Sequence, residues 1–134
     1  MPLIIWNERL SVGVREFDTQ HQKLIQILNN LFDAMSQGQG KEILEKTLSE
    51  LIEYTKIHFA AEERKMKAFN YPHYLSHKAE HDALADKVIE LHHNFQTGKT
   101  VLSVSVMNFL KDWLNNHILK TDKLYAPLMN SKGF

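Results

Sequence analysis

The sequence contains no cysteine, and its 134 residues include only five glycines and three prolines. The lack of thiols excludes disulfide bonds, thiolate zinc sites and iron–sulfur clusters. Sixteen basic and sixteen acidic side chains cancel, so the net charge gives no support to nucleic acid or an anionic membrane as a partner. The apolar run at residues 3–6 is too short for a signal peptide or a membrane span. We therefore expect one cytoplasmic domain, residues 1–134, with no membrane insertion.

Apolar residues recur at spacings of three and four along four stretches, which predicts four amphipathic helices. We expect helices over 19–37, 41–69, 74–96, and from a start within 101–106 to beyond His117. An irregular arm over 1–17 precedes them, Asp18 is the expected N-cap of the first helix, and Pro127 should end or kink the last one. Strand-like alternation occurs only in a doubtful patch at 101–106. The short connections predict an all-α fold, an antiparallel up-down-up-down four-helix bundle over 18–131.

Seven side chains of metal-ligand type lie at inward positions of these helices: His21, His58, Glu62, His77, His81, His117 and Asp122. Their helix regions meet at one end of an antiparallel bundle. Residues four apart share a helix face, as in the pairs His58 with Glu62 and His77 with His81. A single inward histidine is ordinarily a hydrogen-bonded core residue. Buried carboxylates, however, are costly unless they are paired, so bound cations would explain the whole set.

The number and type of these side chains indicate the metal. Five imidazoles and two carboxylates are too many for one tetrahedral zinc ion, and they lack the oxygen-rich cage that calcium or magnesium prefers. Mixed imidazole and carboxylate ligands suit iron or manganese. Two six-coordinate ions bridged by both carboxylates and by an oxide or hydroxide would keep one coordination position open. A small molecule such as dioxygen can bind there.

This arrangement resembles the hemerythrin family, specifically the single-domain bacterial hemerythrins. Flanking residues match as well, namely 18–20 before His21, Tyr71-Pro72 before His77, and Trp113-Leu114 before His117-Ile118. The similarity extends from the arm containing Trp6 to Tyr125. It implies a non-haem di-iron centre that binds O2 reversibly. By this resemblance one iron is saturated by His77, His81 and His117, the other is held by His21 and His58, and Glu62 and Asp122 bridge the two ions.

An apolar O2 pocket is expected around the ligands, formed by Leu24, Phe59, Trp113, Leu114 and Ile118. The same residues would also serve ordinary core packing. Apolar walls withhold the water and acids that are needed to cleave reduced O2, so they favour reversible binding. Ferritin-like di-iron oxidases use mostly glutamates, with Glu and His three residues apart. The ligand pairs of this chain are four apart, which argues against strong oxidation chemistry.

The spacing of His117 and Asp122 does not suit a regular α-helix. The two residues are five apart, which separates them by roughly 140° around the helix axis. Both can point to one site if the helix widens, so we predict a π-type turn near 118–121. The remaining histidines, His73, His92 and His93, are expected on the surface. In the charged run 62–65, only Glu62 is expected to turn inward.

We therefore predict an O2 carrier, store or delivery protein rather than an enzyme, and a monomer whose ligand is dioxygen. Two alternatives stay open. The first is an O2 or redox sensor that acts through a partner protein. The second is a di-iron oxidase or a peroxide- or NO-consuming enzyme. The enzyme would need a proton-donating side chain in the pocket, for which Tyr54 and Tyr125 are the nearest candidates.

Overall fold

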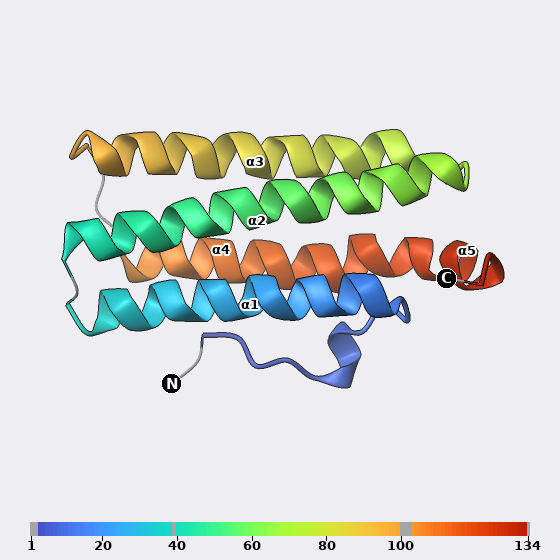
Figure 1. Ribbon diagram of the computed structural model, residues 1–134, viewed down its shortest axis with the longest axis horizontal. Coiled ribbons are helices and arrows are strands. Elements are labelled where there is room, and N and C mark those ends of the chain that lie inside the picture. The colour runs from blue at the N-terminus through green and yellow to red at the C-terminus, as the bar shows by residue number, and fades with distance from the viewer. Residues whose placement is uncertain (1–2, 39, 100–102, 134) are drawn as a thin grey trace.

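The computed structural model describes residues 3–38, 40–99 and 103–133. Four long helices lie side by side and alternate in direction (Figure 1). Their bounds are α1 Arg15–Ser36, α2 Lys41–Ala68, α3 Tyr74–Gln96 and α4 Val104–Asn116. Shorter helical segments follow or precede them: η1 Glu8–Leu10, η2 His117–Thr121, η3 Asp122–Tyr125 and α5 Ala126–Ser131. The predicted all-α up-down-up-down bundle is confirmed, and the described ranges contain no strand.

The first helix begins earlier than predicted, and Asp18 is not its N-cap. Helix α1 starts at Arg15, and its N-cap residue is Val14, which makes no capping bond with its side chain. The Asp18 carboxylate instead accepts hydrogen bonds from the backbone N–H of Val12, at 2.8 Å, and from the hydroxyl of Ser11. The arm folds back over the first helical turn, so the carboxylate meets donors from the arm. Asp18 thus ties the arm to α1.

The turn between α2 and α3 brings two predicted ligand pairs to the same end of the bundle. Helices α2 and α3 match their predicted ranges to within one residue. Asn70 adopts a left-handed conformation with φ 55°, and the N–H of Tyr71 donates to the carbonyl of Met66 at 2.9 Å. This pattern satisfies the last carbonyls of α2. Pro72 then prevents the helix from continuing.

The fourth helix departs most from expectation at its ends. Ser103 caps α4 by accepting a hydrogen bond from the N–H of Val106. The chain is helical from Val104 onward, so the doubtful strand at 101–106 is wrong over that part. Positions 101–102 lie outside the described residues. Pro127 does not end a helix. It lies in the first turn of α5, where its missing N–H costs no helical hydrogen bond.

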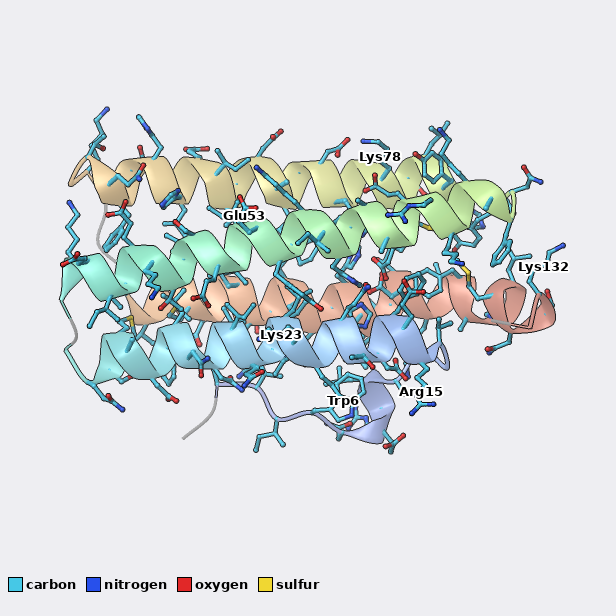
Figure 2. The ribbon with its side chains drawn as sticks, in the orientation of Figure 1. Trp6, Arg15, Lys23, Glu53, Lys78 and Lys132 are labelled. Carbon is cyan, nitrogen blue, oxygen red and sulfur yellow. The ribbon has the colours of Figure 1, made fainter. Side chains whose placement is uncertain are left out.

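The bundle core is apolar along most of its length, and the arm packs against its outside. Asn29 holds the arm by accepting from the Ile4 N–H at 2.9 Å and donating to the Ile4 carbonyl at 2.8 Å. Charged side chains such as Lys23, Glu53 and Lys78 project from the outer faces (Figure 2). The described helices include none that is both long enough and apolar enough to cross a membrane. The buried charged residues gather at one end of the bundle.

Candidate metal centre

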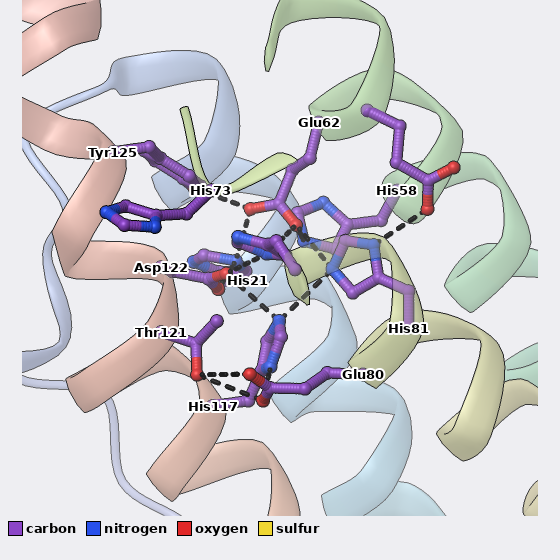
Figure 3. Close-up of polar contacts among 12 residues, drawn as sticks. His21, His58, Glu62, His73, Glu80, His81, His117, Thr121, Asp122 and Tyr125 are labelled. Carbon is purple, nitrogen blue, oxygen red and sulfur yellow. Dashed lines mark hydrogen bonds and ion pairs between the residues drawn. The ribbon is translucent and has the colours of Figure 1, made fainter. Parts of the chain in front are cut away.

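All seven predicted ligands are buried and lie together. Their exposed fractions are 2% or less, and their side chains converge between the four helices (Figure 3). Two groups of ligand atoms are each compact enough to hold one ion. One group is Glu62, His77, His81, His117 and Asp122, and the other is His21, His58, Glu62 and Asp122. The groups share both carboxylates, which is the division that the family resemblance implies.

The ligands come from α1, α2, α3 and the helical segments after α4, all near the same end of the bundle. His21 belongs to α1, His58 and Glu62 to α2, and His77 and His81 to α3. His117 begins the segment η2, a π-helical turn over His117–Thr121, and Asp122 follows it at the start of η3. The predicted widening of the helix is therefore confirmed. It turns Asp122 back toward His117, and Oδ1 of Asp122 lies 3.0 Å from Nε2 of His117.

Asp122 lies between the two groups of histidines. Its Oδ2 lies 3.0 Å from Nε2 of His21, and its Oδ1 lies 2.9 Å from Nε2 of His77. Glu62 has a similar position, since its Oε1 is 3.3 Å from Nε2 of His58 and 3.2 Å from Nε2 of His81. Each carboxylate thus faces histidines of both groups, as a bridging ligand would.

The hydrogen bonds around His81 and His117 test whether a cation fits. The Nδ1 atoms face carboxylate oxygens, 2.8 Å away on Glu63 and 3.2 Å away on Glu80. Because a carboxylate accepts, each Nδ1 carries the proton and each Nε2 presents a lone pair. Those two Nε2 atoms lie only 3.1 Å apart. Two facing lone pairs repel unless a cation or a proton lies against them.

Other buried polar atoms of the centre also lack hydrogen bonds. They are both ring nitrogens of His21 and of His77, Oε1 of Glu62, and both carboxylate oxygens of Asp122. Polar atoms buried without partners are costly, and their concentration in one place calls for a specific explanation. The inward-facing nitrogens and oxygens are of the type that iron or manganese binds. The residues therefore fit a pair of such ions.

The pKa values of these groups show how strongly they interact without a metal. Burial alone would lower the pKa of His21, but Asp122 and Glu62 raise it to about 10. Burial would raise the pKa of Asp122, yet His117 and His21 hold it far below its usual range. Burial lowers the pKa of His58. The centre thus combines anionic carboxylates, a histidine that readily keeps a proton, and one that does not.

Three side chains orient the ligand imidazoles from outside, and none of them was chosen from the sequence. Oε1 of Gln20 lies 2.6 Å from Nδ1 of His58, while Glu63 and Glu80 face His81 and His117. Thr121 in turn donates to Glu80 at 3.0 Å. The expectation that Glu62 alone turns inward from its charged run is wrong, because Glu63 is half-buried against His81. Such partners fix the tautomer and the ring orientation of a ligand.

Tyr125 is a further member of the centre. It is fully buried, and its hydroxyl donates to Oε2 of Glu62 at 2.5 Å. Burial and the charge of Glu62 raise the pKa of Tyr125 well above its usual value, so the phenol keeps its proton. Its position three residues after Asp122 was the available signal. Tyr54, the other candidate, lines a groove with Ile57 on the outside of α1 and α2.

An apolar cavity of about 30 Å³ lies beside the centre. Four of the five predicted pocket residues line it, namely Leu24, Phe59, Trp113 and Leu114, whereas Ile118 is buried but does not line it. The Phe59 ring stacks on His81 with centroids 3.7 Å apart, and Trp113 stacks on His117 at 4.5 Å. Among the described residues that line it, Thr55 carries the one hydroxyl, and the others are aliphatic or aromatic. A buried water needs two to four polar partners, so these walls favour an apolar guest.

The other histidines fall into two groups. His73 and His93 are exposed, as predicted. His92 is not simply a surface residue, because it is half-buried and its Nε2 lies 3.2 Å from the hydroxyl of Ser49. This contact joins α2 and α3 far from the seven ligands.

A helical bundle with two overlapping groups of buried histidines and shared carboxylates is a metal-binding bundle. A family model described as the hemerythrin HHE cation binding domain matches residues 12–129. The chain belongs to the hemerythrin family, and the predicted resemblance is confirmed.

Relatives and solved structures are similar over almost the whole chain. A bacteriohemerythrin from Methylococcus capsulatus is 36% identical and covers 98% of this chain and 100% of its own. One from Stenotrophomonas maltophilia is 35% identical over 94% of this chain and 81% of its own. A crystal structure of a wild-type hemerythrin superposes with a TM-score of 0.90, at 35% identity, covering 94% of this chain and 97% of that chain.

Proposed function

We propose that this protein binds O2 reversibly at a non-haem di-iron centre and acts as an O2 carrier, store or delivery protein. The observation that carries the proposal is the pair of ligand groups that share Glu62 and Asp122 beside a dry, apolar cavity. The groups would hold two iron ions bridged by both carboxylates and by an oxide or hydroxide. Iron bound there would supply the electrons that O2 takes up on binding and returns on release.

The two groups differ in a way that favours binding of O2 at one ion. One group has His77, His81 and His117 in addition to the carboxylates, whereas the other adds only His21 and His58. Fewer protein ligands keep a coordination position open on the second ion. The cavity adjoins both groups, because its wall includes Leu24, one turn beyond His21, and Phe59, whose ring stacks on His81.

The chain also limits the protons that reach this position. Reduction of O2 beyond reversible binding requires protons at the oxygen atoms. Apolar side chains form the cavity wall apart from Thr55, and the proton of Tyr125 is held in its hydrogen bond to Glu62. A dry, apolar site of this kind protects a reactive ligand from proton leakage. This supports release of O2 over its consumption.

Tyr125 is the observation that favours a second candidate, an enzyme that consumes O2, peroxide or NO. A buried phenol that donates to a ligand carboxylate is a proton source close to the metal pair. Its pKa, raised well above the usual value, makes it a weak acid and so a poor general acid at neutral pH. Turnover of substrate at a rate exceeding O2 release would favour this candidate.

An absorption spectrum tests the proposal. Protein containing two iron ions per chain is reduced under anaerobic conditions, exposed to air and then flushed with argon. We expect a visible absorption band that forms in air and disappears under argon over repeated cycles. A band that decays irreversibly while O2 is consumed would favour the enzyme. Protein that retains one zinc ion and no iron after reconstitution would contradict the di-iron centre.

A further inference from the structure

Two cavities of different depth share a wall in this bundle. The outer one is a groove of about 240 Å³ between α3 and α4. The inner one is the apolar cavity of about 30 Å³ beside the metal centre. Val88 of α3 and Leu110 of α4 line both of them. These two side chains are 3% and 5% exposed, so they separate the cavities in the resting structure.

The inner cavity extends from this partition to two aromatic rings that pack on the ligands. Phe59 and Trp113 form part of its wall, and their rings stack on the imidazoles of His81 and His117. From the outside inward, the order is therefore the groove, the partition, the apolar cavity, the rings of Phe59 and Trp113, and the ligand imidazoles. The polar side chains of the groove, including Lys87, Glu90 and Ser105, belong to exposed positions. Its apolar surface includes the half-buried Leu91 and Val106 and the exposed Phe109.

We propose that O2 reaches the metal centre through the groove between α3 and α4, and that Val88 and Leu110 form the gate. This inference rests on the proposed function. O2 is small and uncharged, and it loses little on leaving water for an apolar space, whereas water and ions lose their hydrogen bonds there. Both side chains of the partition are apolar, so their rotation would break no side-chain hydrogen bond.

A second opening near the centre suits O2 less well. A pocket of about 190 Å³ at the start of α3 reaches the ligand His77, and its wall includes the charged or polar side chains of Glu80, Lys120 and Thr121 beside Tyr71 and Leu124. Glu80 there contacts His117 and Thr121. Such walls favour water and ions, which the apolar route excludes. The groove between α3 and α4 therefore has the chemistry that selects an uncharged gas.

The kinetics of O2 binding to the iron-loaded protein test the gate. Leu110→Ala should raise both the association and the dissociation rate constants by about threefold or more, with little change in the equilibrium constant. A gate changes both rates equally because it acts on passage and not on the bound state. Leu28→Ala is the matched control: Leu28 lines the inner cavity but not the groove, so enlarging the cavity there should not reproduce the effect.

A second variant closes the route without altering the core. Ser105 is exposed at the groove, so Ser105→Phe places a ring over the opening and should slow both rates by about threefold. Asn108→Phe, at an exposed position of α4 that does not line the groove, is its control. If O2 binds reversibly but Leu110→Ala and Ser105→Phe both keep wild-type rates, the proposed route is wrong.

Xenon provides a readout that does not depend on O2 binding. Dry apolar cavities bind xenon. Crystals of the iron-loaded wild-type protein under xenon pressure should therefore hold xenon in the groove. Crystals of Leu110→Ala should hold additional xenon in the inner cavity, beside Trp113. Absence of xenon from both spaces would overturn the route. Failure of the wild-type protein to bind O2 would overturn the proposed function instead, and the xenon positions would still decide between the routes.

Discussion

The hydroxyl of Tyr125 donates a hydrogen bond of 2.5 Å to Oε2 of Glu62 inside the buried centre. The bond joins η3, near the end of the chain, to the last part of α2, and both side chains are fully buried. The Tyr125 ring also stacks on His77, with centroids 5.7 Å apart. A single phenol thus supports a carboxylate of both ligand groups and an imidazole of one of them.

Tyr125→Phe should therefore reduce stability while keeping the metal. The change leaves Oε2 of Glu62 without its donor, which costs about 1–3 kcal/mol for a buried acceptor. We expect the thermal unfolding midpoint of the loaded protein to fall by roughly 5 °C, with the iron content unchanged. Tyr54→Phe is the control, because Tyr54 is half-buried away from the centre. Equal midpoints for the two variants would contradict the role of this bond.

Asp122→Asn should remove metal rather than only destabilise the fold. Asp122 places one oxygen 3.0 Å from Nε2 of His21 and the other 2.9 Å from Nε2 of His77. An amide is uncharged and presents one acceptor oxygen, so it cannot bridge two cations in this way. We expect iron bound per chain to fall from about two to one or fewer. Asp112→Asn, at an exposed position of α4, should retain full metal content in the same elemental measurement.

The burial and convergence of the seven candidate ligands could be predicted because these residues contradict the pattern around them. Histidines and carboxylates at positions where the helix period requires apolar residues are conspicuous, and the antiparallel topology places them at one end. The π-helical turn was also predictable, since five residues between His117 and Asp122 do not fit a regular helix. These inferences depend on helix geometry alone, which the sequence determines closely.

Features that depend on packing between elements were harder to predict. Gln20 and Glu63 occupy positions beside ligands, and nothing in the helix period shows that their side chains bend inward to His58 and His81. Asp18 looked like a helix cap because its true partners, Ser11 and Val12, lie in an arm whose path has no periodic signal. Pro127 was expected to interrupt a helix, but a helix starts just before it. In each case a tertiary contact or a chain path decided the outcome.

Metal binding should release protons and weaken as the pH falls. The pKa of His21 is raised to about 10 in the metal-free centre, so this histidine is protonated at pH 7 and must lose its proton to bind iron. The affinity for Fe²⁺ should therefore fall by about tenfold for each unit of pH below 10 for this proton. Anaerobic calorimetry at pH 7 in two buffers of different ionisation enthalpy should give different heats. Equal heats in both buffers would contradict the raised pKa.

The same pKa shift should make the metal-free protein less stable as the pH rises, whereas the metal affinity increases with pH. The folded-state pKa of His21 lies above the ordinary value of 6.5, so its protonated form favours folding. That contribution is fully present below pH 6.5 and is lost as the pH rises through about 10. We expect metal-free protein to lose thermal stability over this range and the loaded protein to lose less. An unfolding midpoint of the metal-free form that rises steadily with pH from 7 to 10 would contradict this assignment.

Gln20→Ala should weaken one of the two metal positions selectively. Oε1 of Gln20 accepts from Nδ1 of His58 at 2.6 Å and so directs the Nε2 lone pair of that ring inward. Loss of such a partner typically costs 10- to 100-fold in metal affinity, and His58 belongs only to the group with His21. A titration with Fe²⁺ should then show one site of nearly normal affinity and one weakened site. The control is Gln22→Ala, at an exposed position of α1, which should bind both ions normally. If Gln20→Ala instead weakens both sites equally, the two groups do not bind separate ions.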